Sequence, residues 1–262
     1  MKLYFAGGEN ESHKIKLDTC KVEKVLQSYY YLRGRSPQKY KDVLLDSGGF
    51  TARIKGVEID VKEYAGFINK NNVKLAINLD TNNVEETLEN QEYLNKNTEA
   101  YILPVYHLSD FLSKEHKGLL DVFAAEYPFI CVGGMAGGRS KRTDVVRFLN
   151  YVYSKIRLKC KIHGLGITGF EMLKQFPFYS VDSTSWLQGE KFGNVLQFNP
   201  RRKGGFEKAF FKDKKDMSKI GKPIDSYKER TIHNIKELLK LENYITKLWE
   251  TRNIKWDTEI YQ

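Results

Sequence analysis

The sequence predicts an α/β protein of the (β/α)8 TIM barrel class, somewhat irregular and extended by a C-terminal helix. Its 262 residues suit one such barrel. Eight short apolar runs, each followed by small or polar turn residues, alternate with helical patterns, which is typical of parallel βα units. The predicted strands are Leu3–Ala6, Val43–Leu45, Leu75–Leu79, Tyr101–Tyr106, Phe129–Val132, Lys161–Leu165, Tyr179–Val181 and Val195–Phe198.

Several intervals between these runs have apolar residues at helical spacing. Residues 181–195 leave too little room for a full helix, so we expect irregular structure there. A longer helix is predicted over 226–254, with Asp225 or Ser226 as its cap. We expect one domain overall, in which 1–200 form the barrel core and 201–262 form a basic loop and a terminal helix packed on the barrel. The other predicted helices are Val61–Asn69, Val84–Leu94, Asp144–Ile156 and Phe170–Phe176.

The composition is that of an ordinary soluble globular protein, with 41% hydrophobic and 29% charged residues. No apolar run reaches the roughly 18 residues of a membrane span, and the first residues do not resemble a secretory signal. We therefore expect a cytoplasmic location and no membrane partner. Cys20, Cys131 and Cys160 are scattered and form no Cys-x-x-Cys pair, which argues against a zinc ribbon or a disulfide framework.

The formal net charge of +10 favours a polyanionic partner. Between Arg201 and Lys222 there are nine basic residues against three acids. Phe206, Phe210 and Phe211 interrupt this segment, a mixture suited to phosphate contacts and base stacking. A solvated loop with aromatics tucked into the core would give the same pattern, and both interpretations stay open.

Three carboxylates, Asp46, Asp80 and Asp182, fall directly after or at the end of predicted strands. In a parallel barrel, functional side chains gather at the carboxyl ends of the strands. A carboxylate in this position is costly unless it is hydrogen-bonded or functional. Each could instead cap a following helix, but three on one rim favour a site.

Glycine-rich turns follow the strands at the same rim. They are Ser47-Gly48-Gly49-Phe50, the segment 133–138, and His163-Gly164-Leu165-Gly166. Glycine lets the backbone approach a ligand closely, so a flat purine could bind against these turns. Tight βα connections also use glycine, and each turn alone is weak evidence.

Five segments in order resemble the tRNA-guanine transglycosylases, the queuine and archaeosine tRNA-ribosyltransferases. The similarity extends from about residue 40 to 250. The similar segments are Asp46-Ser47-Gly48-Gly49-Phe50, Gly133-Gly134-Met135-Ala136-Gly137-Gly138, His163-Gly164-Leu165-Gly166, Val181-Asp182 and Arg230-Thr231-Ile232-His233-Asn234.

The resemblance implies a role for each acid. Asp182 would be the nucleophile that attacks the sugar C1′, and Asp46 the general acid/base. Asp80 would read the N1–H and the exocyclic amine of the purine. The other predicted base-binding residues are Ser47, Gly48, His107, Gly133, Gly134, Met135, His163 and Gly164. The predicted nucleic-acid contacts are Trp186, Arg139, Arg142, Arg201, Arg202 and Lys203.

The chain departs from this family in three places. The family's zinc-binding cysteines have no counterpart near His233, so we expect an unmetallated His233, no zinc subdomain, no metal and no other cofactor. Ser183-Thr184-Ser185-Trp186 replaces a Pro-Thr-Arg element, and Trp186 could stack on a base or fill the barrel top. Val105-Tyr106-His107 replaces a Gln-Gly pair, so His107 is either a base-edge ligand or a structural histidine.

These departures resemble the phage and bacterial branch that inserts 7-deazaguanine derivatives into DNA. We therefore expect DNA, in preference to tRNA, and a free 7-deazaguanine base as partners, with protection from restriction nucleases as the implied outcome. The alternatives are the same exchange on tRNA, a barrel N-glycoside hydrolase, and a catalytically silent nucleic-acid-binding protein. The sequence leaves open which base derivative is used and the oligomeric state, a homodimer included.

Overall fold

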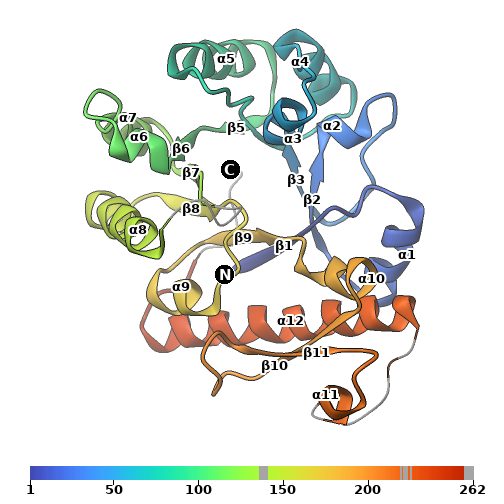
Figure 1. The fold of residues 1–262 in the computed structure, drawn as a ribbon. Helices are drawn as coiled ribbons and strands as arrows, with labels where there is room; N and C mark the ends of the chain where they lie inside the picture. The colour runs from blue at the N-terminus through green and yellow to red at the C-terminus, as the bar shows by residue number, and fades with distance from the viewer. Residues whose placement is uncertain (136–140, 219, 221–223, 225, 257–262) are drawn as a thin grey trace. The chain divides into compact units, whose positions relative to one another are not determined.

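A computed structural model of the protein describes residues 1–135, 141–218, 220, 224 and 226–256. Parallel strands alternate with helices along the chain (Figure 1), which confirms the predicted α/β class of the TIM-barrel type. The chain divides into two compact units. The central unit comprises Ala6–Glu9 and Glu23–Leu165, and the terminal unit comprises Met1–Phe5, Asn10–Val22 and Gly166–Gln262.

Two runs of parallel strands form the central unit. The first run pairs β2 (Lys24–Ser28), β3 (Asp42–Asp46), β4 (Leu75–Ile77) and β5 (Tyr101–Leu103) in chain order. The second pairs β6 (Val105–His107), β7 (Phe129–Gly133) and β8 (Lys161–Gly164). Ser28 is in register with Asp46 and His107 with Gly133, so polar residues and glycine coincide at the strand ends.

Amphipathic helices follow these strands. Asp60 caps α4 and Asn83 caps α5, each by accepting backbone N–H bonds from the first turn. Tyr64 of α4 and Leu94 of α5 are fully buried with Leu45 in one apolar cluster. The helices of the central unit are α2 (Tyr29–Leu32), α3 (Gly49–Ile54), α4 (Val61–Lys70), α5 (Val84–Asn97), α6 (Leu108–Leu112), α7 (Leu119–Glu126) and α8 (Arg142–Ile156).

In the terminal unit, Lys2–Phe5 of β1 (Lys2–Ala6) pair in parallel with β9 (Ser180–Ser183), and Tyr4 lies opposite Asp182. The expected irregularity after β9 is confirmed, because this interval holds only a 3₁₀ turn, η1 (Ser185–Leu187), and a four-residue helix, α10 (Gln188–Lys191). The remaining elements are α1 (Glu11–Thr19), α9 (Phe170–Gln175), β10 (Asn194–Phe198), β11 (Phe206–Phe210), α11 (Lys214–Ser218) and α12 (Tyr227–Thr251).

Two strand predictions were wrong. Val195–Phe198, expected as the eighth barrel strand, lies in β10, which pairs antiparallel with β11 in a separate two-stranded sheet. The parallel sheet includes β2 instead, which the apolar pattern did not reveal. In addition, the run predicted over 101–106 is divided at Pro104, which has no N–H for the ladder. The carbonyl of Pro104 still accepts a bond from the Cys131 N–H at 2.8 Å.

The segment predicted as a basic loop is therefore partly a β-hairpin, and α12 anchors it. The Asn234 and Glu237 side chains accept the backbone N–H groups of Leu196 and Phe198 at 2.8 and 2.9 Å. His233 Nε2 lies 2.9 Å from the Leu196 carbonyl. Side chains of the helix thus satisfy backbone groups along β10 that would otherwise form an open sheet edge. None of the helices among the described residues combines the length and the apolar character needed to cross a membrane.

Candidate functional site

The central unit holds a compact group of charged side chains at the strand ends. His107 Nε2 lies 3.0 Å from Asp80 Oδ2, and Arg53 Nη2 lies 3.7 Å from the same oxygen. Arg53 Nη1 also donates to the Asp80 backbone carbonyl at 2.5 Å. Arg53 belongs to α3, Asp80 follows β4, and His107 ends β6. We call Arg53, Asp80 and His107 the central cluster.

Opposing influences act on the pKa values of this pair. Burial raises the pKa of Asp80, but the hydrogen bond and charge of His107 and the charge of Arg53 outweigh it and hold the pKa below its usual range. Burial lowers the pKa of His107, but its bond to Asp80 and the charges of Asp80 and Asp110 raise it above the usual value. The pair therefore favours an ionised carboxylate beside an imidazolium.

Glycines allow two turns to press against the central cluster. A Cβ added to Gly49 would meet the Asp80 carbonyl at 2.9 Å, and one added to Gly133 would meet the His107 ring at 3.1 Å. Gly134, at φ +78°, is also close to His107. The turns after β3 and β7 thus touch the residues that follow β4 and end β6. The structure brings four of the predicted strand ends together in one unit.

The turn after β3 is built around Asp46. Its carboxylate accepts the Gly48 N–H at 3.0 Å, and the Ser47 hydroxyl accepts the Gly49 N–H at 3.4 Å. Ser47 is fully buried. Gly48 adopts φ +77°, and an added Cβ would lie 2.4 Å from Tyr30 Cβ. Ser47 and Gly48 thus shape the turn that holds Asp46, and their predicted contact with the base stays a prediction.

A buried polar layer from α5 fixes the chain on both sides of Asp80. Asn90 donates to the Leu79 carbonyl at 3.0 Å, and Thr87 Oγ1 accepts the Thr81 N–H at 2.9 Å. Asn78 donates to the Thr87 carbonyl at 2.9 Å. Because these bonds are internal and the groups are largely buried, the position of Asp80 is determined by α5 as well as by the central cluster.

The remaining predicted contacts in the central unit lie outside the central cluster and the turn around Asp46. His163 is 0% exposed and Gly164 is also buried, so both residues belong to the interior of β8. Their predicted contact with the base stays a prediction. Met135 is half-buried just after Gly134, and Arg142 is exposed at the start of α8. Arg139 lies outside the described residues.

In the terminal unit, Asp182 lies within β9 and is 9% exposed. Its Oδ1 accepts the Gly166 N–H at 2.7 Å, so the loop after β8 orients the carboxylate. Gly166 adopts φ +65°, a left-handed conformation that favours glycine at this point. One residue on, the Ser183 hydroxyl accepts the Ser185 N–H at 3.1 Å, which turns the chain into η1.

The Trp186 side chain is not exposed for stacking on a nucleic acid. The indole is 0% exposed and packs edge-on against Phe5 and His13, with ring centroids 6.4 and 5.2 Å away. This burial favours the packing alternative, so Trp186 is removed from the predicted nucleic-acid contacts. Arg230–Asn234, the last of the five segments that carry the resemblance, also contributes to packing. The Arg230 guanidinium lies 3.9 Å above the Phe211 ring.

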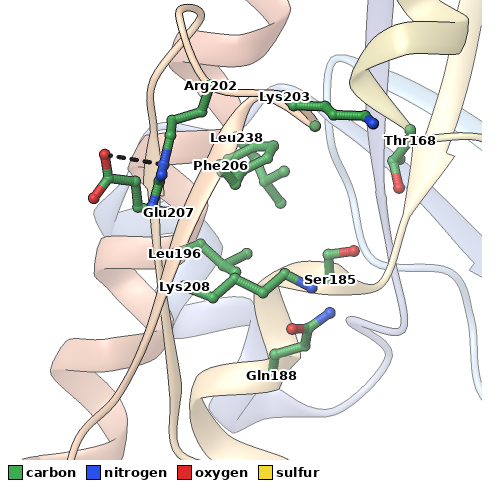
Figure 2. A pocket seen from close by; sticks show the side chains of 12 residues that line it. Thr168, Ser185, Gln188, Leu196, Arg202, Lys203, Phe206, Glu207, Lys208 and Leu238 are labelled. Atoms are coloured by element: carbon green, nitrogen blue, oxygen red, sulfur yellow. Dashed lines mark ion pairs between the residues drawn. The ribbon is translucent and has the colours of Figure 1, made fainter. Parts of the chain in front are cut away.

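A basic pocket of about 590 Å³ opens on the hairpin side of the terminal unit (Figure 2). It includes two predicted nucleic-acid residues, Arg202 and Lys203, while Arg201 is exposed on the same turn. Sequence reasoning missed Lys208, which lines the pocket opposite Leu196 in the hairpin register. The basic pocket is lined by Thr168, Gly169, Ser185, Gln188, Leu196, Arg202, Lys203, Gly204, Phe206, Glu207, Lys208 and Leu238.

No protein-family model matches this chain, and no curated protein matches it. The geometry of the two units is therefore the basis for any functional conclusion. Within the described ranges, no three histidine, cysteine or acidic side chains gather in a way that could hold a metal ion. The expectation that the protein needs no metal or other cofactor stays a prediction.

Proposed function

We propose that this protein is a guanine transglycosylase that exchanges guanine in a nucleic acid, preferably DNA, for a 7-deazaguanine derivative. The observation that carries the proposal is the Asp80 carboxylate, 13% exposed and held ionised by His107 and Arg53. An ionised carboxylate accepts hydrogen bonds only, and guanine presents an N1–H and an amine side by side. Asp80 would therefore select guanine-type bases.

Asp182 would act as the nucleophile. Its oxygen forms a bond to the sugar C1′ as the glycosidic bond breaks, and the electron pair of that bond passes to the departing guanine. The carboxylate also stabilises the positive charge that develops on the sugar. In the second half, the ring nitrogen of the incoming base bonds to C1′ and Asp182 leaves as a carboxylate. Two displacements retain the anomeric configuration.

Asp46 would move the protons. In its acid form it donates a proton to the guanine that departs, and the resulting carboxylate removes the proton from the incoming base. The Gly48 N–H, 3.0 Å from the carboxylate, would hold that carboxylate in place through both halves. The target nucleotide has to leave its stack before any of these groups can reach it.

The resemblance to the tRNA-guanine transglycosylases supports this proposal, with the DNA-modifying branch as the preferred placement. Its five segments include Asp46, Asp182 and the glycines that touch the central cluster. In that setting the exchange would protect DNA from restriction nucleases. The sequence around His233 lacks the cysteine cluster of the zinc-containing enzymes, which supports a substrate other than their tRNA.

An exchange assay tests the proposal. Single-stranded DNA, duplex DNA and tRNA that carry labelled guanine are incubated with the protein, each with and without a 7-deazaguanine base. We expect repeated release of label from DNA only when the incoming base is present; without it, release should stop at one guanine for each protein molecule. Release from tRNA alone would contradict the DNA assignment. Repeated release from DNA without an incoming base, beyond one guanine for each protein molecule, would indicate an N-glycoside hydrolase.

A further inference from the structure

We propose that the basic pocket binds one unpaired nucleotide beside the nucleotide attacked by Asp182, with its phosphate between Lys203 and Lys208. The identity of the neighbouring nucleotide rests on the proposed function, but the pocket itself is defined by the terminal unit alone. A volume of about 590 Å³ lies in the range of small-ligand sites. It has room for one nucleotide and excludes a duplex.

The charges of the pocket leave two cations for a phosphate. Glu207 Oε1 lies 3.4 Å from Arg202 Nε and accepts a bond from Asn199 at 3.0 Å, so Arg202 is already paired. Within the described part of the chain, neither Lys203 nor Lys208 has an ion-pair partner. In Figure 2 the Lys203 side chain extends toward Thr168 and that of Lys208 toward Ser185.

The rest of the lining suits the other parts of a nucleotide. Ser185, Thr168 and Gln188 supply neutral hydrogen-bonding groups at one side of the pocket (Figure 2). Phe206 and Leu238 supply apolar surface on the hairpin and α12, against which a sugar or base can pack. A pocket for inorganic phosphate alone would not need this apolar wall.

The chain itself connects the pocket to Asp182. Gly166, which donates to Asp182, precedes the lining residue Thr168 by two positions. Ser185 follows Asp182 by three positions, a span of at most about 11 Å even when fully extended. A strand whose sugar is bonded to Asp182 would therefore meet the pocket with an adjacent nucleotide.

Internal hydrogen bonds and a close contact hold the turn that carries Lys203. The Asn199 N–H donates to the Gly205 carbonyl at 2.8 Å, and the Gly205 N–H donates to the Arg202 carbonyl at 3.0 Å. Gly205, at φ +76°, approaches Phe170 so closely that an added Cβ would lie 2.4 Å from Phe170 Cγ. A preformed turn lowers the ordering cost of binding.

Fluorescence anisotropy with a labelled single-stranded oligonucleotide containing one guanine tests this site. We expect the double variant Lys203→Gln/Lys208→Gln to bind about tenfold more weakly at low salt. The slope of log affinity against log salt should shrink by about 0.7 for each phosphate contact that is lost. The matched control Lys212→Gln/Lys215→Gln removes the same charge outside the pocket lining and should change affinity less than twofold.

Photocrosslinking tests where the neighbouring nucleotide binds. A photoreactive thymidine placed directly beside the guanine should crosslink to peptides from the basic pocket, while the same base several nucleotides away should not. Equal loss of affinity in both double variants would overturn the proposal. The proposal would also be overturned if Lys203→Gln/Lys208→Gln lost affinity for a deoxynucleoside monophosphate but kept its affinity for the oligonucleotide. Neither assay requires chemistry, so intact pocket binding with no base exchange would refute only the proposed function.

Discussion

The central cluster and the basic pocket differ in how their charged side chains are paired. In the central cluster, Asp80 is bonded to His107, lies beside Arg53 and is only 13% exposed. In the basic pocket, Lys203 and Lys208 are exposed and without ion-pair partners among the described residues. Fixed charges that contact one another suit selection of one ligand geometry, whereas open cations suit attraction of a polyanion. The difference predicts that substitutions in the two places change different measurements.

The largest expected effect concerns the nucleophile and not binding. Asp182→Asn keeps an oxygen that can accept the Gly166 N–H but removes the carboxylate, so base exchange should fall by about 10⁴-fold or more. Oligonucleotide affinity should stay within twofold, because phosphate contacts supply most of it. Single-turnover exchange and anisotropy on the same preparation measure both. Exchange within tenfold of the unmodified protein would remove the assignment of Asp182.

Asp80→Asn should change which base is accepted. The amide presents one acceptor and one donor, so it cannot accept both guanine N–H groups, and kcat/KM for the incoming base should fall by about 10²-fold or more. The preference for a 7-deazaguanine over its analogue without the exocyclic amine should largely disappear. Exchange rates with the two bases give this ratio. A variant that kept the full preference would show that another group reads the amine.

Two glycines separate conformational strain from steric contact. Gly48 and Gly56 adopt φ +77° and +64°, but only Gly48 has atoms close to an added Cβ; none lies within 4 Å at Gly56. Gly56→Ala should lower the free energy of unfolding by about 1 to 2 kcal/mol through strain alone. Gly48→Ala should cost about 1 to 3 kcal/mol more because of the contact with Tyr30. Urea denaturation compares them, and equal costs would show that the turn around Asp46 relaxes freely.

The smallest effect is a pH dependence of stability. The raised pKa of His107 contributes stability that is complete below its unfolded value of about 6.5 and is lost as pH rises through the folded pKa. The lowered pKa of Asp80 contributes stability present above about 3.9 and lost as pH falls through its folded pKa. The pair should therefore stabilise most between about pH 4 and 6.5.

His107→Gln should remove the alkaline part of this dependence. The difference in unfolding free energy between the unmodified protein and His107→Gln should shrink as pH rises above about 6.5, by on the order of 1 kcal/mol for each unit of pKa displacement. Urea titrations at several pH values measure the difference. A difference that stays constant with pH would mean that His107 packs without pairing to Asp80.

The sequence predicted the parallel units better than the hairpin. Apolar runs predicted the parallel strands other than β2, because both faces of a parallel strand are buried. The strand β2 carries Lys24, Gln27 and Ser28 among its five residues, and its buried polar groups hid it. By contrast, Val195–Phe198 is apolar yet belongs to a hairpin. The two successive glycines Gly204 and Gly205, both at positive φ, were the available signal for that turn.

For the candidate site, residue type and strand position predicted the acids but not their partners. Asp46, Asp80 and Asp182 could be found because each is a carboxylate at a strand end. Arg53 lies between the predicted strand Val43–Leu45 and the predicted helix Val61–Asn69, and nothing in its spacing marks the contact with Asp80. Burial also could not be inferred for Trp186 and His163, since an aromatic or histidine at a strand end can point either way.

The claim that residue 182 bonds to the anomeric carbon is tested most directly by isolating the adduct. The protein is mixed with guanine-containing single-stranded DNA without an incoming base, quenched, and examined by intact mass and peptide mapping. We predict a mass increase equal to the DNA minus guanine, located on the peptide that contains Asp182 and absent in Asp182→Asn. An adduct on any other residue, or exchange that proceeds with no adduct at all, would contradict the account.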